Sequence, residues 1–171
     1  WVRGRGSDHV DYRLRHTEVA QTEGAHWLGT SIASLSDLQA VLVVGSNLRK
    51  DHPLFAQRIR QAARRSAAVA AITSVANLRA EHAWAMPVAV RSLGEAGEWL
   101  ALLANVAASV AQSQGVAAPV EGEATAEGQA IAQLLLSGER KAILLGNMAA
   151  HHPNASSLLA LSQWIGRQTG A

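Results

Sequence analysis

Two short polar turns are the residues of this chain best placed to bind or react with a ligand. Gly45-Ser46-Asn47 directly follows an apolar run, and Gly146-Asn147 follows a similar run near the end of the chain. A turn at the carboxyl end of a parallel strand is where α/β folds bind ligands, and the start of the next helix offers free N–H groups that suit phosphate. The functional interpretation is therefore a nucleotide-type site at Gly45, Ser46 and Asn47.

The same turns also have a structural interpretation, because Gly and Asn tolerate a positive φ and are common at tight corners. Arg49 and Lys50 add positive charge beside the first turn, whereas the second turn has no fixed charge beyond its histidines. Neither turn contains the G-x-G-x-x-G or the G-x-x-x-x-G-K-[ST] pattern of phosphate-binding loops. The residues therefore favour two structural corners, of which the first is the better candidate for a ligand.

Several side chains of the protein are of types that ligate metals. Four of them lie near the N-terminus: Asp8, His9, Asp11 and His16. Their spacing matches no metal-binding motif, so no metal site is predicted there. His151 and His152 are adjacent, and neighbouring side chains in a helix or strand point apart. We expect His152, like His52, to fill a turn or cap a helix.

No catalytic residue is predicted. Ser46 follows an apolar run but lacks the G-x-S-x-G elbow that exposes a nucleophile, and the chain has no cysteine. Three carboxylates lie in or beside an expected linker rather than in an acid–base pair: Glu121, Glu123 and Glu127. Trp99 and Trp164 occupy positions that are typical of core residues.

Composition narrows the class of protein. A chain of 171 residues, nearly half of them apolar, is long enough for a sizeable core. The formal charge is only +2, and the arginines gather on one expected helix, which indicates a solvated face and no nucleic-acid groove. The absence of cysteine excludes disulfides and cysteine-ligated iron–sulfur clusters in this stretch. The chain begins at Trp1 rather than Met, and both of its ends look cut.

The longest apolar stretch runs from Trp99 to Ala111 and contains Asn105. It is shorter than the ~20 residues that a membrane-spanning helix needs. No direct membrane insertion is therefore predicted, and no signal peptide is recognised.

The apolar runs and the residues between them predict an α/β fold. Residues 41–44 are apolar without alternation, which is typical of a strand covered on both faces. Pro53 suits the first position of a helix, and a second apolar run follows at 67–73, so the pattern predicts a right-handed βαβ unit. Residues 86–90 predict an edge strand because they include Pro87, and residues 95–112 predict a helix.

The same pattern predicts how the chain is divided. We expect an irregular N-terminal segment at 1–25, a first α/β unit at 26–112, and a mobile linker at 113–123. A helix, a strand and a second His-Pro helix at 124–171 form a second, incomplete α/β unit packed on the first. The predicted architecture is a Rossmann-like, three-layer parallel sheet with helices on both faces.

Read together, these segments resemble the molybdopterin oxidoreductase family. The resemblance rests on the block from Leu35 to Arg65, in which Leu-x-Asp-Leu-x-Ala, close to the family's Leu-x-Asp-Leu-x-x-Ala, precedes a strand, Gly-x-Asn, a turn, His-Pro and a basic helix. Asp11-Tyr12-Arg13-Leu14-Arg15 is similar to a short segment ahead of this domain. The block from Ala142 to Ala171 is more similar to one branch, the large iron–sulfur subunit of bacterial NADH:quinone oxidoreductase, respiratory complex I.

The resemblance implies that the chain is a fragment of a longer subunit. In that branch the 4Fe-4S and 2Fe-2S clusters lie elsewhere in the subunit, and the molybdopterin-like part has lost its cofactor. In active molybdenum enzymes the Gly-x-Asn turn, usually followed by Pro, faces a guanine nucleotide; here Leu48 takes the place of that Pro. The implied state of Gly45, Ser46 and Asn47 is therefore vestigial.

The expected function is a non-catalytic scaffold in electron transfer from NADH to quinone. The expected partners are other peripheral-arm subunits, on the cytoplasmic side of the bacterial inner membrane. The alternative is a fragment of an active molybdopterin oxidoreductase, similar to a formate dehydrogenase or a nitrate reductase, in which Gly45, Ser46 and Asn47 contact the guanine nucleotide.

Overall fold

The fold is built on one parallel sheet. The computed structural model describes residues 4, 6, 28–78 and 84–171, so the predicted segment 1–25 lies outside the described residues except for two of them. The strands are β1 (Ala40–Val44), β2 (Ala68–Thr73), β3 (Val90–Leu93) and β4 (Lys141–Leu145). All of their pairings are parallel and their order across the sheet is β3-β2-β1-β4.

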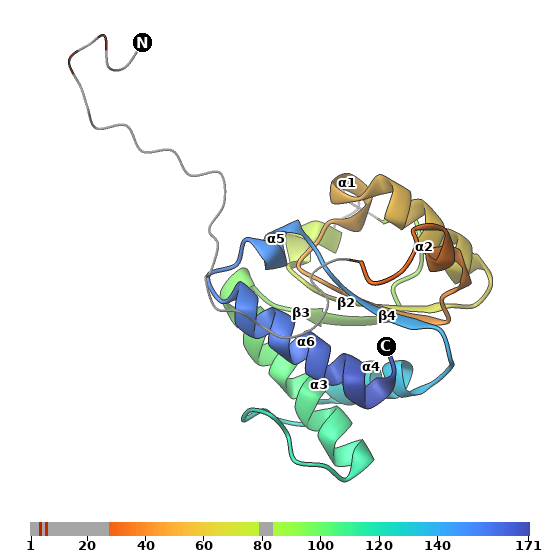
Figure 1. Ribbon diagram of the computed structural model, residues 1–171, viewed down its shortest axis with the longest axis vertical. Helices are drawn as coiled ribbons and strands as arrows, with labels where there is room; N and C mark the ends of the chain where they lie inside the picture. The colour runs from red at the N-terminus through yellow and green to blue at the C-terminus, as the bar shows by residue number, and fades with distance from the viewer. Residues whose placement is uncertain (1–3, 5, 7–27, 79–83) are drawn as a thin grey trace.

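Helices cover both faces of this sheet, as Figure 1 shows. One face carries the 3-10 helix η2 (Ala33–Asp37) and α2 (Pro53–Arg64). The other carries α3 (Trp99–Gln114), α4 (Ala126–Leu136) and α6 (Ala155–Thr169). All five residues of β1 are buried between the two layers, which explains why its sequence is apolar without alternation. The predicted three-layer α/β fold is confirmed.

Within the described ranges, four further short helices lie beside the sheet. They are α1 (Leu48–Asp51), η3 (Val75–Leu78), η5 (Ala96–Glu98) and α5 (Asn147–Ala150). The helix predicted at 95–112 is divided between η5 and α3, and Glu95 and Glu98 form a capping box at its start. It ends at Gly115, whose φ of 66° satisfies the left-handed conformation of a helix end.

The edge strand predicted at 86–90 is displaced along the chain. The observed strand is β3, Val90–Leu93, so only Val90 belongs to both. Proline has no N–H to donate to a ladder, and the backbone bonding to β2 begins only after Pro87, where the N–H of Ala89 donates to the carbonyl of Val69 at 2.8 Å. The predicted position at the edge of the sheet is correct, and the predicted residues are wrong.

The second His-Pro pair does not open its helix in the way that was predicted. Pro53 is the first residue of α2, as expected, but α6 begins at Ala155, two residues after Pro153. The ring of His152 explains the difference, because its Nδ1 accepts the N–H of Asn154 at 3.0 Å and so builds a turn ahead of the helix.

The segment between α3 and α4, which contains residues 115–123 of the predicted linker 113–123, lies against α3. The N–H of Glu123 donates to Oδ1 of Asn105 at 2.9 Å. A side chain at Gly122 would place its Cβ 2.6 Å from the carbonyl oxygen of Ala104, so only glycine permits this approach. The chain on both sides of the segment contributes to one sheet, since β4 pairs with β1.

Candidate functional site

The two Gly-Asn turns lie side by side where the order of the strands reverses. From β1 the chain proceeds to β2 and β3 on one side, and β4 is added on the other side of β1. In open α/β sheets, ligands bind outside the carboxyl ends of the strands at this reversal. The turns after β1 and β4 are those at Gly45 and Gly146, so the sequence candidates are at the position where this fold most often binds a ligand.

The two turns are packed directly on each other. The carbonyl of Gly45 accepts the N–H groups of Met148 at 3.1 Å and Ala149 at 3.3 Å. A Cβ at Gly146 would lie 2.1 Å from Cβ of Ser46 and 2.6 Å from the oxygen of Gly45. Gly45 itself has a φ of 59°, and a Cβ there would meet Trp99 at 2.7 Å. Both glycines are thus needed for the close contact between the two backbones.

The polar groups of the first turn are directed at an acidic side chain from the same chain. Oδ2 of Asp51 accepts the hydroxyl of Ser46 at 2.8 Å and the N–H of Asn47 at 2.9 Å. Ser46 is fully buried and Asn47 is 5% exposed. A carboxylate therefore lies where the phosphate of a nucleotide would be expected, and it accepts two of the donors that a phosphate would use.

The side chain of Asn47 connects the first turn to the neighbouring strand end. Its Oδ1 accepts the N–H of Lys50 at 3.2 Å, and its Nδ2 donates to the carbonyl of Asn77 at 3.5 Å. Asn77 in turn donates to Oγ1 of Thr73, at the end of β2. The residues of the first turn therefore do not fit a phosphate group as they are folded, because a phosphate would have to displace Asp51 and break these bonds.

The histidines that follow the second turn point apart, as predicted. His151 is exposed, while His152 is 7% exposed and packs beside Trp99. Because Nδ1 of His152 accepts the N–H of Asn154, the ring hydrogen is on Nε2, which donates to the carbonyl of Ala96 at 2.9 Å. His152 fills a turn and ties the start of α6 to η5. The indole of Trp99 donates to the carbonyl of Gly94 and is a core residue, as predicted.

The remaining candidates are not brought together. The four residues considered as metal ligands near the N-terminus lie outside the described residues. Within the part of the chain that the structure describes, no group of three His, Asp or Glu side chains is placed to hold a metal ion.

Among the described helices, none is long and apolar enough to cross a membrane. Trp84 is 3% exposed and belongs to the core beside α2.

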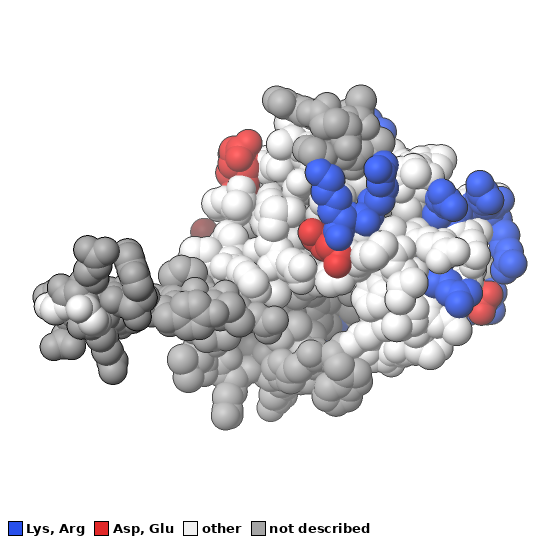
Figure 2. Space-filling model, turned by 90° about the horizontal axis from the view of Figure 1, so that it is seen from above, with Lys and Arg blue, Asp and Glu red and all other residues white. Residues whose placement is uncertain are grey.

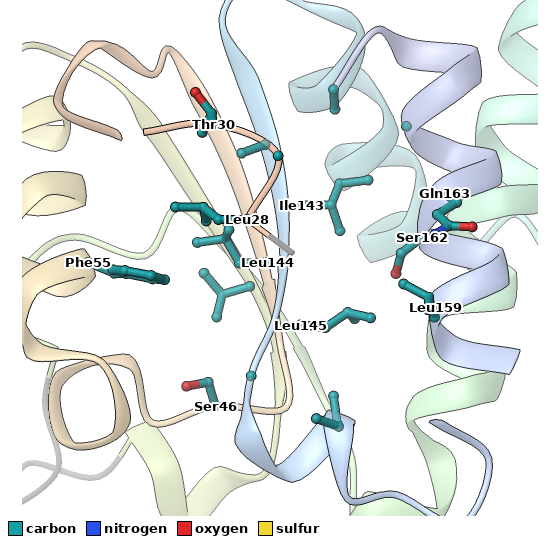
Figure 3. A pocket seen from close by; sticks show the side chains of 18 of the residues that line it. Leu28, Thr30, Ser46, Phe55, Ile143, Leu144, Leu145, Leu159, Ser162 and Gln163 are labelled. Atoms are coloured by element: carbon teal, nitrogen blue, oxygen red, sulfur yellow. The ribbon is translucent and has the colours of Figure 1, made fainter. Parts of the chain in front are cut away.

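The structure adds two features that sequence reasoning missed. One is Asp51, which no motif in the sequence singled out; a carboxylate four residues after a turn amide was the available signal. The other is a hollow of about 980 Å³ beside β4. Figure 3 shows that it flanks this strand on both faces, with Leu28, Leu144 and Phe55 on one side and Leu145 and Ser162 on the other.

Basic side chains do not form a continuous surface on the face seen in Figure 2. They lie in two separate groups, and acidic side chains lie beside each group. One ion pair joins Arg65 to Asp37 at 3.7 Å, and both side chains are more than half exposed. The described basic residues are thus exposed to solvent, and acidic side chains beside them offset part of their charge.

Comparison with known proteins agrees with the fold. The family model for molybdopterin oxidoreductase matches residues 4–166. A search of curated proteins found no match. The match covers nearly the whole chain, including both Gly-Asn turns and every strand of the sheet. The chain belongs to the molybdopterin oxidoreductase family.

Proposed function

We propose that this chain is a non-catalytic scaffold portion of the large iron–sulfur subunit of bacterial NADH:quinone oxidoreductase. Family membership supports an oxidoreductase origin. The similarity of residues 142–171 to that subunit favours this branch over others. One observation carries the non-catalytic part of the proposal: Asp51 accepts both Ser46 and Asn47 in a turn that a cofactor phosphate would otherwise use.

The packing at the strand ends supports the same conclusion independently of charge. A ligand at the strand reversal needs a crevice between the turns that follow β1 and β4. Here the backbone at Gly45 accepts hydrogen bonds from the turn after Gly146, and a single Cβ would not fit between them. The sheet therefore keeps the frame of a cofactor domain while its ligand edge serves as an internal contact.

The proposed setting follows from this role. The iron–sulfur clusters, 4Fe-4S and 2Fe-2S, belong to other parts of the subunit, since this stretch has no cysteine. The partners are other peripheral-arm subunits of complex I on the cytoplasmic side of the bacterial inner membrane. The domain holds the cluster-bearing part and its neighbours in place during electron transfer from NADH to quinone.

A second candidate is a fragment of an active molybdopterin oxidoreductase of the formate dehydrogenase or nitrate reductase type. The observation that favours it is the location of both turns at the strand reversal, with Arg49 and Lys50 in the short helix that follows the first. In that case Gly45, Ser46 and Asn47 contact a guanine nucleotide, and Asp51 must leave its present partners when the nucleotide binds.

Purification of the full-length parent subunit from solubilised membranes through an affinity tag separates the two candidates. We expect the purified subunit to carry cluster-bearing proteins with it and to show NADH-dependent quinone reduction. If the purified subunit shows formate oxidation or nitrate reduction activity and no NADH oxidation activity, this result contradicts the first proposal and supports the second.

A further inference from the structure

Charge is distributed unevenly along this chain. Residues 49–65 contain six Lys and Arg residues and a single acidic residue, Asp51. Residues 92–139 contain six acidic residues and no Lys or Arg, and all six acidic side chains are exposed. The net charge of the whole chain is only +2, so a nearly neutral total conceals two segments of opposite sign.

The sheet separates these two segments in space. α2 lies on one face of the sheet, and α3 and α4 lie on the other, as Figure 1 shows. The carboxylate of Asp51 is bonded to the first Gly-Asn turn, so it does not belong to the outer surface of α2. Five of the six acidic residues lie at or shortly before the starts of α3 and α4: Glu95, Glu98, Glu121, Glu123 and Glu127. The α2 layer is therefore basic, and the opposite layer is acidic.

The outer face of α2 combines this charge with an exposed apolar residue. The inner face packs on the sheet through Ala56, Ile59 and Ala62, which are buried. Exposed positions recur at helical spacing on the opposite side: Leu54, Gln57, Arg58 and Arg64. The helix contains no acidic residue. Leu54 is 63% exposed and lies one turn before Arg58, so an apolar side chain and positive charges share one surface.

The arginines of α2 have little internal compensation. Arg65, at the end of the helix, pairs with Asp37. Among the described residues, Arg58, Arg60 and Arg64 form no ion pair. Arg60 and Arg64 are four residues apart, a spacing at which like charges disfavour a helix. A cost of this kind, which the described residues do not offset, points to a negatively charged partner outside them.

The chemistry of the surface favours a protein as that partner. A membrane-surface helix buries its apolar face in lipid, whereas the apolar face of α2 is already buried on the sheet. Single-stranded nucleic acid needs exposed aromatic rings for stacking, and the only aromatic ring of α2, Phe55, packs on the core and stacks on His52. Arginine beside an exposed apolar residue is typical of protein interfaces. Charge of one sign also steers a diffusing partner, which a covalently attached segment does not require.

We propose that the outer face of α2 docks an acidic surface of a neighbouring protein subunit. Arg58 and Arg64 pair with carboxylates of that subunit, and Leu54 packs against an apolar residue beside them. The proposal rests on the proposed function, because it identifies the surface through which the scaffold contacts a peripheral-arm subunit.

Photo-crosslinking in the solubilised complex of the full-length parent subunit tests the identity of the occupant. A photoreactive amino acid in place of Gln57 should form a crosslink to a separate polypeptide, within a peptide rich in Asp and Glu. The control is the same amino acid in place of Gln112, an exposed residue of α3, which should not crosslink to that peptide. A crosslink from position 57 to another part of the parent subunit, or to residues 121–127 of a second copy, overturns the proposal.

Charge reversal tests whether the arginines carry the contact. Arg58→Glu combined with Arg64→Glu should lower the yield of this crosslink on the order of 10-fold, and Arg58→Gln with Arg64→Gln should lower it less. Arg91→Glu combined with Arg167→Glu makes the same change of charge at exposed positions of β3 and α6 and should leave the yield unchanged. Thermal unfolding of each variant verifies that it is folded. An unchanged yield in the folded variants of Arg58 and Arg64 overturns the proposal.

A lipid surface is the competing occupant, and vesicles of phosphatidylglycerol test it. If the full-length subunit binds these vesicles, and the reversal of charge at Arg58 and Arg64 abolishes that binding while the crosslink persists, α2 faces a membrane and the proposal is wrong. The identity of the crosslinked protein tests the proposed function, whereas the dependence of its yield on charge tests the docking surface. The two can therefore fail separately.

Discussion

Asp51 determines what the first Gly-Asn turn can do. Its carboxylate accepts the buried hydroxyl of Ser46 and the buried N–H of Asn47, so the turn is satisfied from within the chain. The sequence correctly identified Gly45, Ser46 and Asn47 as the residues to consider. It did not identify Asp51, because the pairing depends on how the short helix α1 folds back, which no spacing rule for phosphate loops describes.

Replacing Asp51 tests its role at this turn. Asp51→Ala leaves two buried donors without their acceptor and should lower the free energy of unfolding by about 2 kcal/mol, measured by urea denaturation. Asp51→Asn keeps an acceptor oxygen and should cost less. The matched control is Asp37→Asn, which removes an exposed carboxylate from an ion pair and should change stability by less than about 0.5 kcal/mol. Equal effects at the two positions would show that the Asp51 bonds are unimportant.

The contact between the two turns gives a second prediction at this scale. Gly146→Ala places a Cβ against Ser46 and the backbone of Gly45, neither of which can move freely, and should destabilise the chain by about 3 kcal/mol. Gly97→Ala is the control, since a Cβ there meets nothing within 4 Å. Thermal unfolding of both variants provides the measurement, and an unchanged midpoint for Gly146→Ala contradicts the interlocked arrangement.

At the scale of elements, the runs of apolar residues predicted the strands well where burial is complete. β1 and β2 are close to their predicted ranges because strands covered on both faces have an unmistakable composition. β3 was misplaced because only its pairing with β2 selects which residues join the sheet. The start of α6 was misplaced because a side-chain ring, that of His152, builds the preceding turn.

The central and edge strands should respond differently to the same truncation. Leu42 in β1 is fully buried, and Leu42→Ala should cost about 3 kcal/mol through lost contacts and a residual cavity. Leu144 in β4 is half-buried beside the hollow, so Leu144→Ala should cost about 1 kcal/mol in the 171-residue chain. Urea denaturation of the two variants compares them, and equal losses would mean that β4 is as enclosed as β1.

The segment between α3 and α4 offers a further prediction for the elements. Gly122→Ala would force this segment away from the carbonyl of Ala104. We expect residues 116–124 to become the first site of cleavage in limited proteolysis, while the wild-type segment resists. Gly97→Ala again serves as the control, and unchanged cleavage in Gly122→Ala would show that the segment is not held on α3.

The whole molecule has the frame of a ligand-binding α/β domain and packs its two Gly-Asn turns against each other at the strand reversal. The class of fold and the location of the candidate turns followed from composition, periodicity and the two similar Gly-Asn turns. The packing of the turns did not, because it depends on backbones brought together from distant parts of the chain: Gly45 with Ala149, and Ser46 with Gly146. The hollow beside β4 also could not be predicted from the sequence, since its position depends on the order of the strands in the sheet.

The most direct test of this account is the cofactor content of the purified full-length parent subunit. Molybdenum is measured by mass spectrometry of the metal, and guanine nucleotide and pterin are measured after release by denaturation. The account predicts only trace amounts of all three, because Asp51 and the interlocked glycines close the strand reversal. Molybdenum and guanine nucleotide in stoichiometric amounts would contradict it.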